Sequence, residues 1–264
     1  GECNFCAIAV HQGRTIASRS EDSILREAKE ITKDKNFKGY IEDVGGPTAN
    51  MYGFDCDKMV TKGVCEDKRC LYPKRCKGVK INHNAQIELL KKLRKIPKIK
   101  KAFVRSGIRY DLILEDKKYG KEYLKELLEH HISGQMKVAP EHTTQSILDL
   151  MGKPNKQTLI DFKNLYDNTN KELGKKQFLT YYLIASHPGC GEKEMNELGR
   201  FCKETLRFTP EQIQIFTPTP STYSTLMYYT KINPFTKKPI FIETDMNKKE
   251  RQKNMLICTK SKSK

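Results

Sequence analysis

Cysteines at short intervals are the residues of this chain best suited to chemistry. Cys3 and Cys6 form a C-x2-C pair near the start of the sequence. A second group has the spacing C-x8-C-x4-C-x5-C and consists of Cys56, Cys65, Cys70 and Cys76. Thiolates at such intervals bind zinc or iron–sulfur clusters, whereas a C-x2-C pair alone also occurs in redox sites. The spacing predicts metal binding, with half of a zinc knuckle as the alternative for the first pair.

The second cysteine group lies in an interval, about 53–80, that has little periodic apolar pattern. A loop of this length needs something to order it, and a metal bound by four thiolates can do so. Its spacings differ from the short arms of common zinc ribbons. We expect metal rather than free or disulfide-bonded thiols, as either tetrahedral zinc or a 4Fe–4S cluster. We interpret Cys190 and Cys202 as structural, and Cys258 has no assignment.

The composition is that of a basic globular protein. The 264 residues suffice for one large domain, and 37% of them are hydrophobic. No run approaches the roughly 18 apolar residues of a membrane span, and no signal-peptide pattern is present. Because the cysteines have ligand-like spacings rather than a disulfide pattern, we expect a reducing, cytoplasmic location and no membrane contact.

A net charge of +17 arises from 49 Lys and Arg against 32 Asp and Glu. Such an excess can mark a nucleic-acid partner. A purely compositional origin is the alternative, because lysine dominates and is spread along most of the chain, whereas arginine leads at sites that read phosphate.

Predicted strands and helices alternate along the chain. The strand-like segments are 37–44, 101–105, 135–139, 178–185 and 213–216, and the helix-like segments are 20–31, 84–96, 119–131, 156–173 and 192–206. Such alternation predicts an α/β fold with a parallel sheet and crossover helices. The unusual motifs follow strands, at the edge where parallel α/β folds build their sites.

Seven segments in a fixed order resemble one family, the YgiQ-type radical-SAM proteins, from residue 1 to about 230. Phe5 stands where the radical-SAM motif C-x3-C-x-(aromatic)-C has its aromatic residue, which places the first cysteine upstream of Gly1. We therefore expect the chain to be the C-terminal piece of a longer protein. The other segments are His11–Arg14, Asp43–Tyr52, Ser106–Asp111, Lys137–Thr143, Ser186–Gly189 and Phe216–Pro220.

This resemblance implies a fold and an activity. The fold is a partial (β/α)6 TIM-like radical-SAM barrel over residues 1–235, lacking its first strand here, with the cysteine-rich insertion at 53–80 and a basic, partly disordered extension at 236–264. A 4Fe–4S cluster held by Cys3, Cys6 and the upstream cysteine cleaves S-adenosylmethionine to a 5′-deoxyadenosyl radical. An electron donor such as flavodoxin or ferredoxin is implied, and the same chemistry favours a second cluster over zinc at the second cysteine group.

The resemblance also places residues around S-adenosylmethionine. Phe5 lies against the adenine. Gly45 and Gly46 present backbone carbonyls to the amino group, and Pro47 stands where the superfamily has Glu. Glycines allow the close approach that this needs, although an ordinary turn is the alternative.

Three further strand ends carry candidate ligands. Arg109 is expected to bind the carboxylate of S-adenosylmethionine or a substrate anion, with a salt bridge to Asp111 as the alternative. Glu141 can accept from ribose hydroxyls or pair with a cation, or it can serve as a carboxylate at a helix N-terminus. His187, with Pro188 and Gly189, resembles the adenine-side segment, and a bare turn is again the alternative.

Two classes of function remain open. The first is a radical-SAM enzyme whose substrate and catalytic residues the sequence does not identify; the chain by itself is expected to be inactive because the third cluster ligand is upstream. The second is a basic nucleic-acid-binding module whose cysteines hold structural zinc. A radical-SAM enzyme that modifies RNA would combine both, since residues 216–222 resemble a strand end of methylthiotransferases. Iron content and salt-dependent binding discriminate these classes.

Overall fold

The computed structural model describes residues 2–46, 48–210 and 213–257. Its five strands are β1 (Tyr40–Ile41), β2 (Lys101–Ala102), β3 (Gln135–Glu141), β4 (Phe178–Ala185) and β5 (Gln214–Ile215). The longer helices are α2 (Glu21–Ile31), α4 (Asn84–Leu93), α8 (Lys156–Glu172) and α9 (Glu192–Phe201). Helix α6 (Gly120–Glu126) continues into the π-helical turn η1 (Leu127–His131), and α9 continues into η2 (Cys202–Leu206). Strands and helices thus alternate as predicted, and the fold is α/β.

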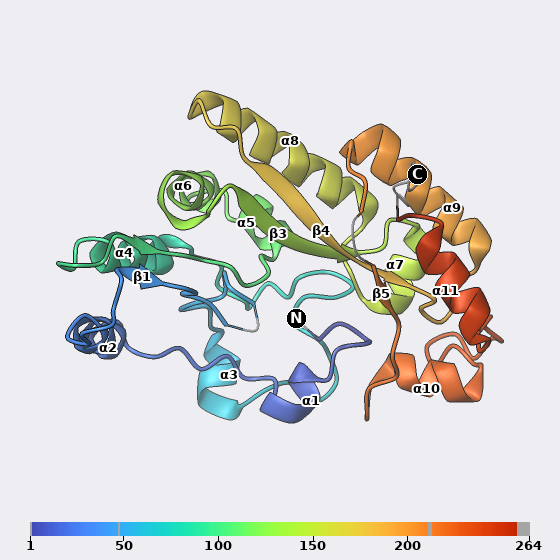
Figure 1. The fold of residues 1–264 in the computed structure, drawn as a ribbon. Coiled ribbons are helices and arrows are strands. Elements are labelled where there is room, and N and C mark those ends of the chain that lie inside the picture. The colour runs from blue at the N-terminus through green and yellow to red at the C-terminus, as the bar shows by residue number, and fades with distance from the viewer. Residues whose placement is uncertain (1, 47, 211–212, 258–264) are drawn as a thin grey trace, which may run out of the picture.

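All strand pairs are parallel, and neighbouring strands follow the order of the chain. β1 pairs with β2, and β3, β4 and β5 form a second sheet in that order. A parallel bridge between Ile108 and Val138 links the segment after β2 to β3. The result is an open arc of two small sheets rather than a closed barrel (Figure 1).

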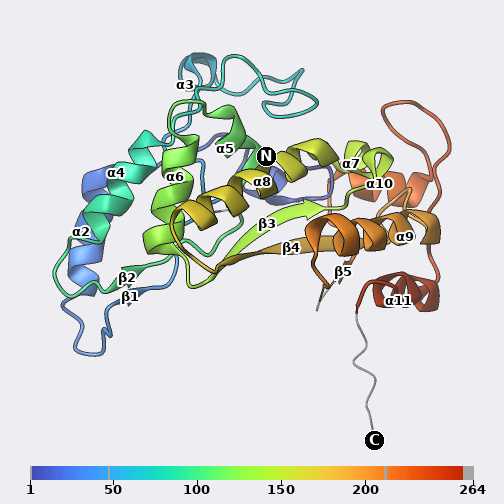
Figure 2. The ribbon, with the colours of Figure 1, turned by 90° about the horizontal axis from the view of Figure 1, so that it is seen from above.

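Helices cover one side of this arc in the same order. Helix α2 contacts α4, α4 contacts α6, and α6 contacts α8, so that they lie side by side (Figure 2). Helices α4, α6 and α8 each lie in a crossover between consecutive strands, which parallel strands require, whereas α2 precedes β1. The N-terminal segment lies on the other side of the strands, together with α1 (Ile8–Gln12) and α3 (Asp57–Lys62) (Figure 1).

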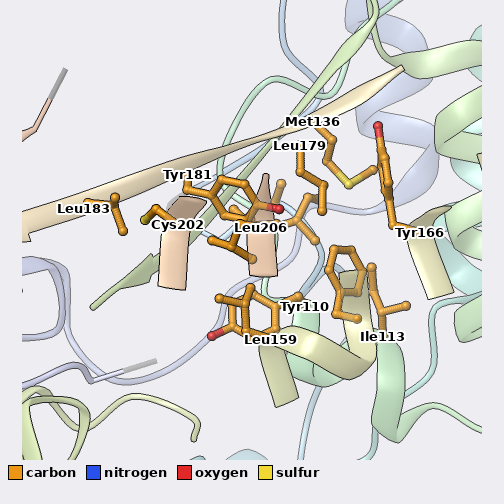
Figure 3. Close-up of a cluster of buried hydrophobic side chains, with 14 of the residues drawn as sticks. Tyr110, Ile113, Met136, Leu159, Tyr166, Leu179, Tyr181, Leu183, Cys202 and Leu206 are labelled. Atoms are coloured by element: carbon orange, nitrogen blue, oxygen red, sulfur yellow. The ribbon is translucent and has the colours of Figure 1, made fainter. Parts of the chain in front are cut away.

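The main core fills the space between β3, β4 and the helices. Tyr110, Leu159 and Tyr166 pack there against side chains of both strands (Figure 3). Phe162 belongs to the same cluster. The alternating burial of β3 and the wholly buried end of β4 supply the apolar face. Local signals support these elements, since the Asn155 side chain caps α8 by accepting from the Thr158 N–H at 2.9 Å.

Strands β1, β2 and β5 are shorter than predicted, with two residues each. Beyond β1, the Asp43 carboxylate accepts from the backbone N–H groups of Arg105 and Ser106 at 2.8 and 3.3 Å. A side chain there takes the place of the neighbouring strand's carbonyls. The apolar pattern of residues 37–44 and 101–105 does not reveal this substitution, so the predicted lengths were wrong.

Six helices lie outside the predicted set. They are α1, α3, α5 (Tyr110–Glu115), α7 (Gln145–Met151), α10 (Tyr223–Thr230) and α11 (Met246–Asn254). Helix α11 differs most from expectation, because it lies in the basic extension and contacts β4 and β5. Its Gln252 accepts from the Ser186 hydroxyl at 2.9 Å, and its Lys249 donates to the Tyr228 hydroxyl at 3.0 Å. Helix α11 is therefore docked through two buried side chains, Lys249 and Gln252, while most of its other residues are exposed.

No helix within the described part of the chain combines the length and apolarity that crossing a membrane requires.

Candidate functional site

A cavity of about 460 Å³ lies between the N-terminal cysteine loop and the ends of β2 and β3. Its wall includes Cys3, Phe5 and Cys6 from the loop, and Arg109 and Glu141 from the strand side. All five residues were predicted for the site. Cys3 and Glu141, the first and the last of them, are 138 positions apart in the sequence. The volume suits a small-molecule ligand, for which pockets of roughly 300–1,000 Å³ are typical.

Asn4 anchors the cysteine loop between its two thiols. Its backbone N–H donates to the Met151 carbonyl at 2.8 Å, and its side chain donates to the Leu150 carbonyl at 2.7 Å. The Asn4 carbonyl accepts from the Ser224 N–H at 2.9 Å. The next residue is held as well, since the Thr219 hydroxyl donates to the Phe5 carbonyl at 2.9 Å. Four bonds to α7, α10 and the segment before α10 thus fix the loop that carries Cys3 and Cys6.

Two of the three guanidinium nitrogens of Arg109 are hydrogen-bonded, and the third is not. Its Nε and Nη2 donate to the Asp111 carboxylate at 2.8 and 2.5 Å, so the predicted alternative of a salt bridge is present. Its third nitrogen, Nη1, is buried and has no hydrogen-bond partner. The Asn50 side chain holds the Arg109 backbone through bonds of 2.8 and 2.9 Å. A buried, unpaired guanidinium N–H in a cavity wall is a donor that a ligand anion can satisfy.

Electrostatics keep Arg109 charged. Burial acts to lower its pKa, but the Asp111 carboxylate reverses this effect and raises the pKa above its ordinary value. The neighbouring Tyr110 hydroxyl has a raised pKa because it is buried and lies near Asp111. The site therefore presents a permanent cation beside a neutral phenol.

Glu141 and Lys153 form a second polar pair in the wall. The Lys153 Nζ lies 3.6 Å from Glu141 Oε1, donates to the Ala139 carbonyl at 2.7 Å and stands 5.5 Å from the centre of the Phe5 ring. Burial raises the pKa of the Glu141 carboxyl, and Lys153 offsets part of the rise. Glu141 pairs with a cation and precedes α7 by several residues, so it is not the helix-terminal carboxylate considered above.

Strained backbone marks two strand ends near the site. Glu141 at the end of β3 has φ +66°, and Ser186 just after β4 has φ +59°. Left-handed conformations are costly for residues other than glycine and persist only where the surroundings impose them. Strand ends of parallel sheets are where such strain accompanies function.

His187 lies behind Phe5 and outside the cavity wall. The two rings meet edge to face with centroids 6.3 Å apart. Its Nδ1 is 2.9 Å from the Pro188 carbonyl, which can only accept, so Nε2 accepts from the Ser224 hydroxyl at 2.7 Å. Burial lowers the pKa of His187 to about 4. This residue supports the aromatic wall from beneath.

Gly189 serves packing in the turn after His187. It has φ +86°, and a Cβ at this position would lie 2.5 Å from the Leu150 side chain of α7. Only glycine fits there. Neither Pro188 nor Gly189 lines the cavity.

The predicted glycine pair also stays out of the wall. A Cβ on Gly45 would lie 2.7 Å from the Ser106 hydroxyl, whereas Gly46 has open space around it. Thr48, shortly after them, does line the cavity. Pro47 lies outside the described residues. The role predicted for the carbonyls of Gly45 and Gly46 remains a prediction.

The second cysteine group lies next to the first site. A small cavity of about 50 Å³ is lined by Cys56 and Cys70, and it shares Glu2, Arg14 and Met51 with the larger cavity. Burial raises the pKa of the Cys70 thiol, and Glu2, Cys56 and Cys76 act in the same direction while Arg14 opposes them, so these groups are electrostatic neighbours.

The eight described cysteines are free thiols rather than disulfides. Within the described ranges, no three Cys, His, Asp or Glu side chains converge closely enough to hold a metal ion. Cys3 and Cys6 line one cavity, and Cys56 and Cys70 of the second group line another, but neither set is closed into a ligand shell.

Several residues of the site were not singled out from the sequence. Asn4 and Lys153 carried no signal, because each acts through contacts with distant segments. Arg14 belonged to a motif of the resemblance, but its partners, the carbonyls of Cys65 and Lys68, could not be read from spacing. Its bonds to them are 2.5 and 2.7 Å long.

Known proteins similar to this chain are UPF0313 proteins. One from Fusobacterium nucleatum subsp. nucleatum is 62% identical over 256 residues, which cover 97% of this chain and 45% of that protein. Another from Clostridium botulinum strain 657 is 49% identical over 97% of this chain and 40% of the relative. One from Clostridium perfringens strain SM101 is 47% identical over 97% of this chain and 38% of the relative. No protein-family model matches the chain.

The chain thus spans less than half the length of these curated relatives, at 38–45% of each. Their names state no activity, cofactor or partner. The similarity extends over 97% of this chain.

Proposed function

We propose that this chain is the catalytic part of a radical-SAM enzyme of the YgiQ type, and that the cavity of about 460 Å³ binds its cofactors. The chain-ordered parallel arc, with helices between successive strands, supports a partial (β/α) barrel as its framework. The similarity to UPF0313 proteins supports the same assignment at the level of the family.

One observation carries the proposal: Cys3, Cys6 and Arg109, whose guanidinium has one nitrogen without a hydrogen-bond partner, line the same cavity. Cys3 and Cys6 supply soft thiolate ligands, and Arg109 Nη1 supplies a buried donor without a partner. The thiolates would bind an iron–sulfur cluster, and the guanidinium donor would bind the carboxylate of an amino-acid cofactor. The residues present therefore fit both groups, with a third thiolate supplied by a segment that would precede Cys3.

In this proposal, the bound cluster and S-adenosylmethionine supply a 5′-deoxyadenosyl radical for hydrogen abstraction. The protein holds and shields them. Cys3 and Cys6 would hold the iron of the cluster. Asn4 fixes the loop that carries them to α7 and α10. Arg109 binds the carboxylate through Nη1 while Asp111 keeps its guanidinium oriented.

The remaining wall residues position and exclude water. Phe5 offers a ring to the adenine, and His187 supports that ring from behind. Lys153 holds Glu141 in a buried pair, which leaves the carboxyl able to accept from ribose hydroxyls. An electron donor such as flavodoxin or ferredoxin in the cytoplasm is part of this proposal.

A basic zinc-bearing nucleic-acid module is the competing function, supported by the net charge of +17. The same charge would suit a radical-SAM enzyme that acts on RNA, because a basic surface attracts phosphate backbones. Bound zinc without iron, with steeply salt-dependent RNA binding, would favour the module.

The test uses the full-length protein that contains this chain. It is reconstituted anaerobically with iron and sulfide, reduced, supplied with S-adenosylmethionine and assayed for 5′-deoxyadenosine. We expect product from the unaltered protein and loss of product in Cys6→Ala. Cys202→Val, which changes a buried core cysteine at similar volume, should retain it.

A second readout tests Arg109 without turnover. Arg109→Gln should weaken the binding of S-adenosylmethionine to the reconstituted protein by about tenfold or more, because one charge-assisted hydrogen bond is lost. The exposed Arg26→Gln is the matched control. Equal binding by both variants would remove Arg109 from the site, and equal product from Cys6→Ala would contradict the proposal as a whole.

A further inference from the structure

The segment that carries the second cysteine group has little regular structure of its own. Between residues 53 and 83 it contains only the six-residue helix α3. Figure 2 shows it as a loop that projects at one edge of the molecule, opposite the strands. Its apolar support is a small cluster built on Met51, Phe54 and Leu112. A loop of this length with so little core needs another source of order.

Three of the four cysteines of this loop, Cys56, Cys70 and Cys76, lie near one another. A Cβ added to Gly78 would lie 3.8 Å from Cys76 Sγ and 3.9 Å from Cys56 Sγ, so glycine leaves the gap between two sulfurs unfilled. The Cys76 N–H donates to the Cys70 carbonyl at 2.8 Å, and Cys70 lines the same small cavity as Cys56. The fourth, Cys65, lies near Lys58 of α3, the helix that Cys56 caps.

All four side chains are neither buried in the core nor fully exposed. Structural cysteines such as Cys190 and Cys202 are buried in this protein, and they pack in the main core. Partly exposed thiols on an irregular loop instead have the environment of metal ligands, since ligation needs both sulfur and access.

We propose that Cys56, Cys65, Cys70 and Cys76 form a second metal centre with four thiolate ligands, taking zinc or an iron–sulfur cluster. Zinc and iron–sulfur clusters both accept four thiolate ligands. The loop must tighten around Gly78 on binding, because the described thiols are not yet at a common ligating distance. This centre is separate from the cavity and stands whether or not the radical-SAM proposal holds.

Two arginines couple this centre to the first cysteine loop. Arg14 donates to the carbonyls of Cys65 and Lys68 and pairs with Glu2, with Nε 2.6 Å from the carboxylate. Arg69, next to Cys70, donates to the Asn4 side chain at 2.5 Å. Because Asn4 lies between Cys3 and Cys6, metal at the second group fixes the anchor of the first loop.

The experiment isolates the second centre in the full-length protein by removing the first with Cys3→Ala/Cys6→Ala. Metal and acid-labile sulfide are measured after anaerobic purification and reconstitution. We expect about one zinc, or about four iron with as many sulfides, to remain per chain. Adding Cys70→Ala/Cys76→Ala should remove it, whereas adding Cys202→Val should not.

Limited proteolysis gives an independent readout. Metal should protect the 53–83 segment from cleavage, and a chelator should expose it while the strands stay intact, because ordering of the loop is coupled to binding. Gly78→Val should lower metal occupancy by filling the gap between the sulfurs.

Recovery of zinc, or of iron with sulfide, would support a thiolate centre. The measured metal also shows which of the two the centre holds. Metal content that is equal with and without Cys70 and Cys76 would overturn the proposal. Thiol titration showing disulfides among the four in the anaerobically purified protein would overturn it as well.

Discussion

Two regions of this molecule are held together by different forces. From α6 to η2, Tyr123, Phe162 and Leu198 are fully buried in one large apolar core. From residue 2 to 83, the chain relies on two small apolar clusters and on arginine and asparagine side chains that bond backbone carbonyls. Apolar burial tolerates small shifts because it is non-directional, whereas hydrogen bonds and metal ligation depend on geometry. The first region is a scaffold. The second region carries both cysteine groups, and the scaffold positions it.

The cavity lies where these regions meet. Cys3, Phe5 and Cys6 come from the polar region, and Glu141 and Lys153 come from the scaffold. A site at such a junction can be damaged from either side, and the two kinds of damage should differ in what they change.

The largest effect should come from a cavity in the scaffold. Phe162→Ala removes a fully buried ring that packs on Tyr110 and Tyr166, with centroids 5.8 and 6.3 Å away. The free energy of global unfolding of this variant should be about 3–5 kcal/mol lower than that of the unaltered protein. Denaturant unfolding measures this loss, and the exposed Asn164→Ala on the same helix is the control. A loss below that of the control would show that the core is not the source of stability.

Acidification should act next, at the junction. The pKa of His187 is lowered to about 4 by burial, and that of His142 to about 3 by burial and the nearby His187. Each is below the ordinary 6.5, so the unfolded state takes up protons first as the pH falls. Stability present above pH 6.5 is therefore lost towards pH 4, by about 2 kcal/mol for His187 between pH 6.5 and 5.

His187→Asn tests this pH dependence. The asparagine amide can still donate to the Pro188 carbonyl, but it does not titrate. Unfolding free energies measured from pH 7 to 5 should fall less steeply than in the unaltered protein, with the exposed His11→Asn as the control. Parallel slopes in all three proteins would contradict the assignment of His187 as a buried neutral group.

The smallest global effect should come from the polar region. Arg14→Met removes the bonds to Cys65 and Lys68 and leaves Glu2 without its cation. Opening of the loop should become easier by about 1–3 kcal/mol, with little change in global unfolding. Hydrogen exchange of amides in residues 53–83 measures this, and the exposed Arg26→Met is the matched control. Equal destabilisation of the loop and the core would mean that the two regions are one cooperative unit.

The sequence by itself determined the α/β alternation and the elements with strong periodicity. Helix α8 and strands β3 and β4 lie close to their predicted limits, since their apolar residues recur at the intervals that helices and strands require. Two cysteines, Phe5, Arg109 and Glu141 line one cavity, and the cofactor-binding roles given to them from the sequence stay predictions. Periodicity and strand direction are local properties, and the residues carry them.

Only the tertiary structure decided what depends on contacts between distant segments. It shortened β1 by bringing the Asp43 carboxylate to Arg105, and it docked α11 on the sheet through Gln252 and Lys249. It also left Gly45 and Gly46 outside the cavity wall and placed Lys153 within it. Each outcome depends on a hydrogen-bond partner or a buried surface supplied from far along the chain, and the spacing of neighbouring residues does not encode such a partner.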